Sequence, residues 1–194
     1  DLRLMAPLDT VEVARANRDT LAGIKVRVGF HASGNSGLVP LEIARQVADE
    51  VDMPMMVHID VPPPTLADVL GLMRKGDVLT HCFRPFPNSP ATADGKVREA
   101  VLEARARGVI FDIGHGMGSF SFATARTMLK NKFLPDCISS DVHALCIDGP
   151  AFDLLTTMSK FVELGMDFNE IIRSATETPA KALLRPDLGT FRTG

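Results

Sequence analysis

The chain has 194 residues, of which 45% are hydrophobic, and a formal net charge of −3. This composition is enough for one domain with a core, and the mild acidity gives no electrostatic reason to bind nucleic acid or an anionic membrane. Trp and Tyr are absent, so few side chains could stack on bases. No apolar run approaches the roughly 20 residues of a membrane span, and we expect no signal peptide.

The cysteine content indicates a reducing environment. Cys82, Cys137 and Cys146 are odd in number and lack CxxC spacing, which argues against a disulfide framework. Cys82 and Cys137 lie in apolar, strand-like runs and are expected to pack as small hydrophobic side chains. We therefore expect a cytoplasmic protein.

The first third of the chain alternates helix-like and strand-like stretches. Asp9 or Thr10 can cap a first helix, and Gly23 stops it. Pro40 opens a second helix with an apolar inner stripe. The expected elements are a helix over 10–22, a strand over 24–28, a flexible loop over 30–37, a helix over 40–51 and a strand over 53–59.

The same unit repeats along the rest of the chain. Three consecutive prolines, 62–64, exclude regular structure, and Thr65 can cap the helix that follows. The expected elements are a helix over 65–74, a strand over 78–83, a loop over 84–95, a helix over 97–107, a strand over 109–113, a loop over 114–119, a helix over 121–131, a strand over 137–140, a helix over 153–164 and one or two helices over 169–184.

Apolar strands separated by amphipathic helices predict an α/β fold, with a parallel sheet covered on both faces. An open doubly wound sheet is disfavoured because the glycine-rich loop 114–119 has the wrong spacing for a dinucleotide and comes late. A (β/α)8 TIM barrel is favoured, because barrel enzymes carry ionisable residues at strand ends. Only five strands are expected, so we predict a partial barrel whose N-terminal strands are missing, with Leu2–Leu8 as the end of an earlier strand and loop.

Four strand-like runs carry a side chain that can bind metal, which we place at the carboxyl end of each strand. These are Lys25 in GIKVRVG, His58 in MPMMVHI, His81 in DVLTHCF and Asp141 in CISSDVHA. Carboxyl ends of neighbouring parallel strands open on one face, so the four side chains predict a bridged two-metal hydrolytic site. Each alone has an ordinary explanation: a solvent-facing lysine, core histidines bonded to backbone carbonyls, and a helix-capping aspartate.

These segments resemble the amidohydrolase superfamily, and most closely its amidohydrolase/deacetylase metallohydrolases, which are related to dihydroorotases. The resemblance covers about Gly23 to Gly189 and also rests on PLEIARQVADE, GVIFDIGHGMGSFSF, GPAFDLLTTMSKFVELGM and TPAKAL. It implies a (β/α)8 barrel with a small β-rich domain built from both chain ends. On this mapping residues 1–185 run from just before strand four through strand eight, and residues 186–194 begin the return to the small domain.

The resemblance also implies roles for the four candidate ligands. Lys25 would be carboxylated and bridge two divalent metal ions, usually zinc; as a carbamate it offers two oxygens that suit the spacing of about 3.5–4 Å in two-metal sites. His58 and His81 would bind the second metal, and Asp141 would bind the first and act as general acid and base. The family's HxH, which completes the first metal site, is absent from these residues. Either a longer parent chain supplies it, or this piece cannot assemble the full site.

Further side chains are candidates for substrate binding. Arg27 could bind a carboxylate, although a structural ion pair explains it equally well. His115 and Gly116 lie in a glycine-lined loop where backbone can approach a ligand, and His143 follows Asp141 by two residues. Ordinary loop packing is an equal alternative for both histidines.

The sequence therefore predicts a metal-dependent hydrolase that cleaves an acyl ester or amide of a small molecule. A hydroxide bridging the metals would attack the carbonyl, and Asp141 would carry its proton to the leaving group. The resemblance favours deacetylation of a small acylated hydroxy or amino acid. A cyclic amide hydrolase of the dihydroorotase type and an inactive, truncated relative that only binds a ligand stay open as alternatives. Unpaired sheet edges also leave a homo-oligomer open.

Overall fold

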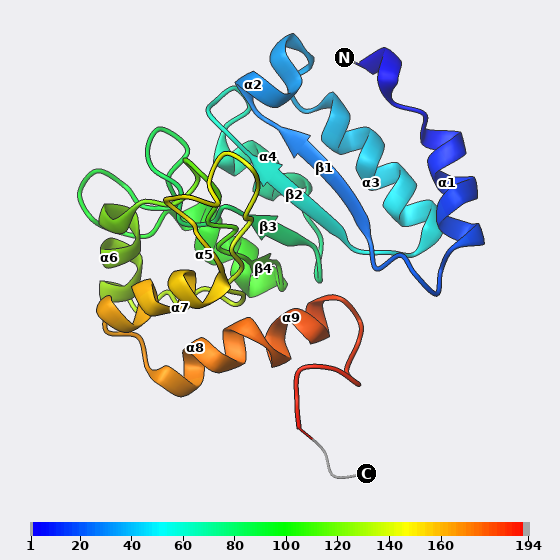
Figure 1. Ribbon diagram of the computed structural model, residues 1–194. Coiled ribbons are helices and arrows are strands. Elements are labelled where there is room, and N and C mark those ends of the chain that lie inside the picture. Colours follow the sequence, from blue (N-terminus) through cyan, green and yellow to red (C-terminus); the bar gives the residue numbers. More distant parts are fainter. Residues whose placement is uncertain (1, 192–194) are drawn as a thin grey trace. The chain divides into compact units, whose positions relative to one another are not determined.

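The computed structural model describes residues 2–191 and is drawn as a ribbon in Figure 1. The chain forms two compact units. The first unit contains the residues up to 80 together with 99–109, and the second contains residues 81–98 together with those from 110 onward. Within residues 2–191, no helix has the length and apolar character to cross a membrane.

The first unit is built on three parallel strands, β1 (Ile24–Val28), β2 (Met55–Ile59) and β3 (Val78–Thr80), hydrogen-bonded in that order. Helices connect successive strands, as parallel pairing requires. The helical elements are η1 (Leu2–Leu4), α1 (Pro7–Ala16), α2 (Phe30–Ser33), η2 (Gly34–Ser36), α3 (Val39–Val51), α4 (Leu66–Leu72) and α5 (Glu99–Arg107). Helix α3 packs on β1 and β2, α1 packs on α3, and α4 packs on α3 and α5.

The two faces of this sheet differ in exposure. One face carries buried apolar side chains from β1 and β2, namely Val26, Val28, Met55, Val57 and Ile59. The alternate residues face the other way, and of these Lys25 and Arg27 are exposed while His58 is half-buried. In the β1–β2 register, Arg27 lies opposite His58 and Lys25 lies opposite Met56. All the polar candidates on these two strands therefore share the more open face.

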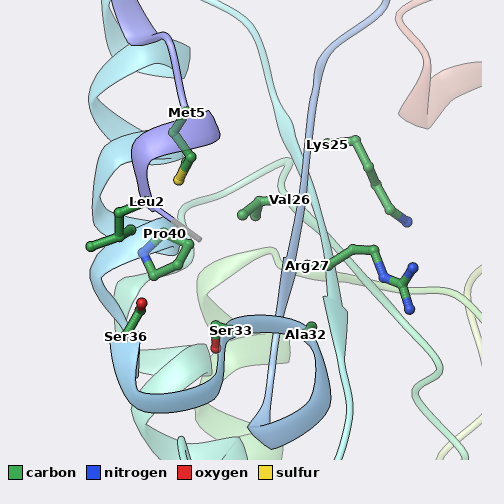
Figure 2. A pocket seen from close by; sticks show the side chains of 9 residues that line it. All are labelled: Leu2, Met5, Lys25, Val26, Arg27, Ala32, Ser33, Ser36 and Pro40. Atoms are coloured by element: carbon green, nitrogen blue, oxygen red, sulfur yellow. The ribbon is translucent and has the colours of Figure 1, made fainter.

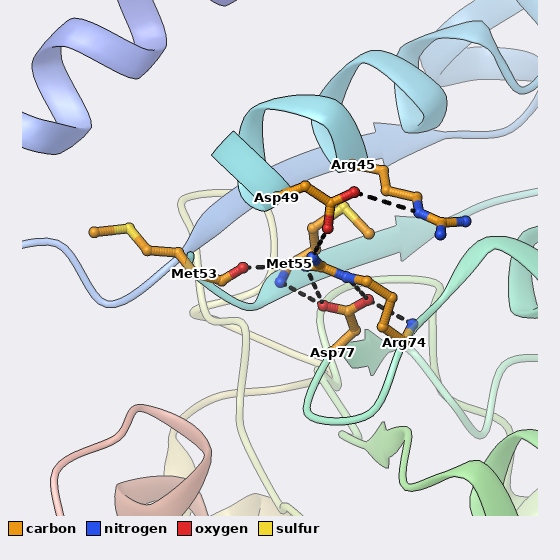
Figure 3. Close-up of polar contacts among 6 residues, drawn as sticks. All are labelled: Arg45, Asp49, Met53, Met55, Arg74 and Asp77. Carbon is orange, nitrogen blue, oxygen red and sulfur yellow. Dashed lines mark hydrogen bonds and ion pairs between the residues drawn. The ribbon is translucent and has the colours of Figure 1, made fainter. Parts of the chain in front are cut away.

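A buried carboxylate ties the beginnings of β2 and β3 together (Figure 3). The Asp77 side chain is fully buried and accepts hydrogen bonds from the backbone N–H of Met55 at 2.8 Å and of Arg74 at 2.7 Å. The Arg74 guanidinium donates to Asp77 at 3.1 Å and to the Met53 carbonyl at 3.0 Å, and it also pairs with Asp49 on α3. One arginine thus connects α3 with the segments before two strands.

The part of the second unit that the structure describes, up to residue 191, contains one short strand, β4 (Ile110–Phe111), and four helices. The helices are α6 (Phe122–Lys130), α7 (Leu154–Glu163), α8 (Phe168–Ala175) and α9 (Glu177–Ala182). Ser121, Asp153 and Asp167 cap α6, α7 and α8 by accepting backbone N–H bonds in the first turn, as N-cap side chains do. An aromatic cluster joins α7 to the loop before α6, with Phe120 5.8 Å from Phe161 between ring centroids.

Residues 111–116 and 136–140 run side by side in parallel and share a ladder of backbone hydrogen bonds. Cys137 donates to the Phe111 carbonyl at 3.1 Å, and Ile113 donates to the Cys137 carbonyl at 3.0 Å. Further along, His115 donates to Ser139 and Gly116 to Ser140, at 3.1 and 3.0 Å. The ladder is a strand-like pairing, although only the Asp112–Cys137 bridge within it has regular β geometry.

Most expected helices are confirmed within a few residues, and β1 has its expected bounds. The expected strand over 78–83 is shorter, because the chain turns at His81, which has a φ of 66°. Of the expected strand over 109–113, only Ile110–Phe111 is regular, and Asp112 follows in an isolated bridge with Cys137. The expected strand over 137–140 is the second side of the ladder rather than a regular strand.

Three expectations near the N-terminus are wrong. The first helix is Pro7–Ala16 rather than 10–22, because Pro7 suits a first turn and the N-cap is Ala6. The expected loop over 30–37 is instead helical, as α2 and η2, because the Asp60 carboxylate accepts the N–H groups of His31 and Ala32. Leu2–Leu4 is a 3-10 helix rather than the end of a strand. In the expected return to a small domain, 186–194, residues 192–194 lie outside the described residues.

We expect Asp77→Ala to destabilise the protein strongly, because it leaves the Arg74 guanidinium and two backbone donors without their buried acceptor. Breaking a buried pair of this kind costs about 3–5 kcal/mol in the free energy of unfolding. Urea unfolding followed by circular dichroism measures this. Glu170→Ala, which removes the exposed partner of Arg173, is the matched control and should cost at most about 1 kcal/mol. Equal effects of the two changes would contradict a structural role for Asp77.

Candidate metal centre

In the first unit, Lys25 and His58 lie on the same, more open face of neighbouring strands. His58 is the fourth of five residues in β2, close to its carboxyl end, as expected. Lys25 is the second residue of β1, so the expectation that it ends its strand is wrong. The strand begins at Ile24, whose N–H bonds the Pro54 carbonyl, and continues three residues past Lys25. The lysine stem must therefore extend along the strand to reach the level of His58.

A pocket of about 240 Å³ borders the β1 segment that carries Lys25 (Figure 2). Figure 2 shows Lys25 and Arg27 pointing together away from one side of the strand, while Val26 points toward Pro40 at the start of α3. The other lining residues are Leu2, Met5, Ala32, Ser33 and Ser36. His58 does not line this pocket, so the pocket by itself is not the predicted metal centre.

In the second unit, His81 has the surroundings of a metal-binding histidine. It follows β3 directly, is 2% exposed, and holds a left-handed backbone with a φ of 66°. Its Nδ1 lies 2.6 Å from the Gly114 carbonyl oxygen. A carbonyl only accepts, so Nδ1 carries the ring proton and Nε2 keeps its lone pair. Histidines that bind metal are commonly oriented by such a bond on the other ring nitrogen.

Asp141 follows the ladder directly and is exposed. Its backbone is also left-handed, with a φ of 43°. A Cβ added to Gly116 would lie 2.8 Å from the Asp141 Oδ2 atom, so the carboxylate occupies space that only glycine leaves open. Non-glycine residues in this conformation are uncommon and gather at functional sites, because the surrounding structure has to hold the strain.

The short segment Gly114–Gly116 therefore contacts both candidate ligands of the second unit. The Gly114 carbonyl accepts from His81, and the Gly116 backbone borders the Asp141 carboxylate. The segment is held by Ser139, whose Oγ accepts from the Gly114 N–H at 3.1 Å and donates to Asp112 at 2.9 Å. His81 and Asp141 thus both contact the Gly114–Gly116 segment, which hydrogen bonds hold in place.

His115 lies in the middle of this segment and is 3% exposed. Its ring stacks on Phe120 with centroids 4.7 Å apart, its Nδ1 lies 2.9 Å from the Gly116 carbonyl, and its Nε2 lies 2.8 Å from Lys160 Nζ. Burial lowers the pKa of His115, and burial also lowers the pKa of Lys160. Nothing in the sequence singles out Lys160 as functional; the one weak signal is a lysine directly before the buried Phe161 on an amphipathic helix.

The remaining candidate side chains differ in their exposure and in their hydrogen bonds. Arg27 and His143 are exposed, and His143 Nδ1 accepts from the Leu145 N–H at 3.3 Å. His31 is also exposed. Burial and the nearby carboxylates of Asp112 and Asp136 raise the pKa of the Cys137 thiol to about 12, which makes a thiolate ligand at this position unfavourable.

Within residues 2–191, no group of three or more His, Cys, Asp or Glu side chains is placed to hold a metal ion. Lys25, the remaining candidate ligand, is not one of these four residue types. The donor set itself suits zinc, because imidazole and carboxylate are ordinary zinc ligands and His81 already has the matching tautomer. The types of donor and the orientation of the His81 ring are therefore those of a metal site. The metal centre as a whole stays a prediction.

Curated proteins with similar sequences are named deacetylases. The deacetylase of Enterococcus faecalis is 41% identical over 179 residues, which covers 91% of this chain and 48% of the relative. Those of Brucella anthropi and Agrobacterium fabrum are 35% and 34% identical over 173 residues, covering 89% of this chain and 43% and 42% of the relatives. The chain thus spans about half the length of the curated relatives it matches. No family model matches it.

Solved structures with the same fold agree with these relatives. A structure described as an adenine deaminase superposes with a TM-score of 0.95 at 38% identity, over 100% of this chain and 54% of the other. A dihydroorotase structure gives 0.87 at 31% identity, over 98% and 51%. Both are amidohydrolases with a TIM barrel, which confirms the prediction of an α/β fold that is part of such a barrel. Sequence and fold together show that the chain belongs to the amidohydrolase superfamily, among its deacetylase-like members.

Proposed function

We propose that the full-length protein is a metal-dependent hydrolase that removes an acyl group from a small ester or amide. The observation that carries the proposal is the state of His81, which is buried, has a left-handed backbone, and is oriented by the contact of its Nδ1 with the Gly114 carbonyl, as metal-binding histidines commonly are. The likeness to deacetylases over nine-tenths of the chain supports the same reaction class.

In this proposal His58, His81 and Asp141 are direct metal ligands, and Lys25 becomes a ligand after carboxylation. A free ammonium cannot bind a cation, whereas a carbamate presents two oxygens. Lys25 is an exposed residue, so carbon dioxide can approach its side chain. Zinc is the metal that this set of imidazole and carboxylate donors suits best.

When bound, a divalent metal polarises the acyl carbonyl and makes an attacking water more acidic. Asp141 takes a proton from that water at a carboxylate oxygen and passes it to the leaving oxygen or nitrogen. The Gly114 carbonyl keeps the His81 ring in one tautomer, and Gly116 leaves the space in which the Asp141 carboxylate lies. Arg27, Gly116 and His143 are proposed contacts for the substrate. The fourth candidate, His115, is buried with both ring nitrogens engaged by Gly116 and Lys160, which favours the alternative of loop packing.

A cyclic amide hydrolase is the second candidate, because the chain is 31% identical to a dihydroorotase of the same fold. Deacetylation is preferred since the curated relatives with 34–41% identity are named for it. Assays of acetylated hydroxy and amino acids beside cyclic ureides separate the two. A homo-oligomer and a cytoplasmic location are further proposals. The second is supported by the three buried cysteines, none of which forms a disulfide.

Lys25→Ala should remove most of the bound metal from the full-length protein, because the bridging ligand is lost. Elemental analysis of the purified protein measures this, and added short carboxylic acids should restore part of the metal by filling the same space. Arg27→Ala, on the same face of β1, is the matched control and should keep its metal. Full metal content in Lys25→Ala would show that Lys25 is an ordinary surface lysine.

Asp141→Asn should keep most of the metal and lose turnover. The amide keeps one oxygen donor and the size of the side chain but cannot accept a proton, so kcat should fall by roughly 10²–10⁴-fold, as loss of general acid–base catalysis does. Metal content and kcat are measured on the same preparation. Near-normal turnover on any substrate that the wild type hydrolyses would exclude Asp141 as the proton carrier.

Gly116→Ala should reduce activity more than it reduces stability. The added methyl would lie 2.8 Å from the Asp141 Oδ2 atom, at a φ of 52° that alanine adopts only with strain of about 1–2 kcal/mol. Gly118→Ala in the same loop is the control, because a Cβ there meets nothing within 4 Å. Comparing kcat and Tm for both variants gives the test, and equal activity would mean that the Asp141 carboxylate needs no such space.

A further inference from the structure

Lys160 on α7 and His115 are 45 positions apart in sequence and in direct contact. The Lys160 Nζ atom lies 2.8 Å from His115 Nε2 and 2.5 Å from the Pro150 carbonyl oxygen. An ammonium group only donates hydrogen bonds, so Nε2 must be the acceptor. The ring proton is then on Nδ1, where it is donated to the Gly116 carbonyl at 2.9 Å. Lys160 and the Gly116 carbonyl thereby both select the same neutral tautomer of His115.

This lysine is unusual for its surroundings. It is half-buried, yet among residues 2–191 it forms no ion pair with a carboxylate. Partly burying a charge without an opposite charge is unfavourable, so packing alone does not account for a lysine here. Its partners are instead a buried imidazole and one carbonyl. The arrangement favours a role in holding His115 over a role in stabilising the fold.

The bond made by His115 acts on the backbone that serves both candidate ligands. Gly114 and Gly116 flank His115, and both have positive φ values, 45° and 52°. The Nδ1 bond to Gly116 closes this turn on one side, while the ladder to Ser139 and Ser140 holds it on the other. As a result, the Gly114 carbonyl faces His81, and the Gly116 backbone, which has no side chain, lies beside the Asp141 carboxylate.

We propose that Lys160 is a positioning residue, which holds the Gly114–Gly116 turn in its working shape through the Nδ1–H tautomer of His115. It touches neither candidate ligand, and acts on His81 and Asp141 only through this turn. The proposal rests on the metal-binding function proposed above for those two residues. Lys160 is held in place by the neighbouring Phe161, which packs with Phe120, the ring on which His115 stacks.

The test uses the full-length protein and two measurements. Nitrogen-15 NMR of histidine-labelled, metal-free protein reports the tautomer of His115, whose signals are assigned by their loss in His115→Gln. Competition with a chromophoric chelator gives the affinity for Zn²⁺ alone. Lys160→Met keeps the stem and removes the donor, Lys160→Arg keeps a donor, and Lys130→Met, at an exposed position at the end of α6, is the matched control.

We expect Lys160→Met to lose the single Nδ1–H form and to bind Zn²⁺ about tenfold more weakly, the lower end of what partners of metal ligands contribute. Lys160→Arg should restore part of both, and Lys130→Met should change neither. The double variant Lys160→Met/His115→Gln should bind Zn²⁺ no more weakly than the weaker single variant, since both changes interrupt one path. If Lys160→Met does not fold, Lys160→Gln, polar and too short to reach, should show the same losses.

Retention of the Nδ1–H form and of wild-type affinity in Lys160→Met would overturn the proposal, as would additive losses in the double variant. Failure of the metal-binding function itself looks different. In that case the wild type binds no Zn²⁺, while the tautomer measurement still reports whether Lys160 controls His115.

Discussion

The ladder of backbone hydrogen bonds between residues 111–116 and 136–140 determines where the candidate site residues of the second unit lie. Parallel pairing brings the two segments to the same level, so that the positions of His115 within the ladder and of Asp141 just after it follow from its register. A shift by one residue would reverse which side chains face each side. The polar side chains Ser139 and Asp112 reinforce the pairing, since both bond within it. The positions of Gly114 and Gly116 beside His81 and Asp141 depend on this register.

His81 and Asp141, in the same region, both have a left-handed backbone that is unfavourable for non-glycine residues. Each such residue costs of order 1–3 kcal/mol, which the surrounding contacts have to offset. In the first unit, the non-glycine residue Asp52 is also left-handed, but it ends α3, where that conformation is common. His81 and Asp141 end no helix, and their strain is more simply explained by the direction their side chains must take.

The elements that could be predicted from the sequence are those with a local signal. Thr65 and Asp68 form the capping box that starts α4, and Ser121 and Asp153 cap the helices expected after them. The strand face of Lys25 and Arg27 follows from alternation with Val26 and Val28. The position of Lys25 near the start of its strand could not be predicted. Where a strand begins and ends depends on its register with the partner strand, which the apolar run alone does not determine.

Contacts between distant segments were equally beyond reach. The Asp60 carboxylate, which accepts the N–H bond that helps to make residues 30–33 helical, lies 28 positions from its partner Ala32. Lys160 and His115 are 45 positions apart. Nothing in the local pattern of either lysine or aspartate indicates these partners. The roles of Asp77 and Arg74 belong to the same class, since the sequence shows two common surface residue types and only the fold buries one of them.

The burial of all three cysteines has a practical consequence for spectroscopy. The Cys137 thiol, with a pKa near 12, is almost wholly protonated at neutral pH and reacts slowly with maleimides and methanethiosulfonates. A cysteine introduced at an exposed position such as Lys130 or Lys75 would then carry a spin label or fluorophore selectively. Pairs of such labels would allow distances within this chain to be followed in solution without first removing its native thiols.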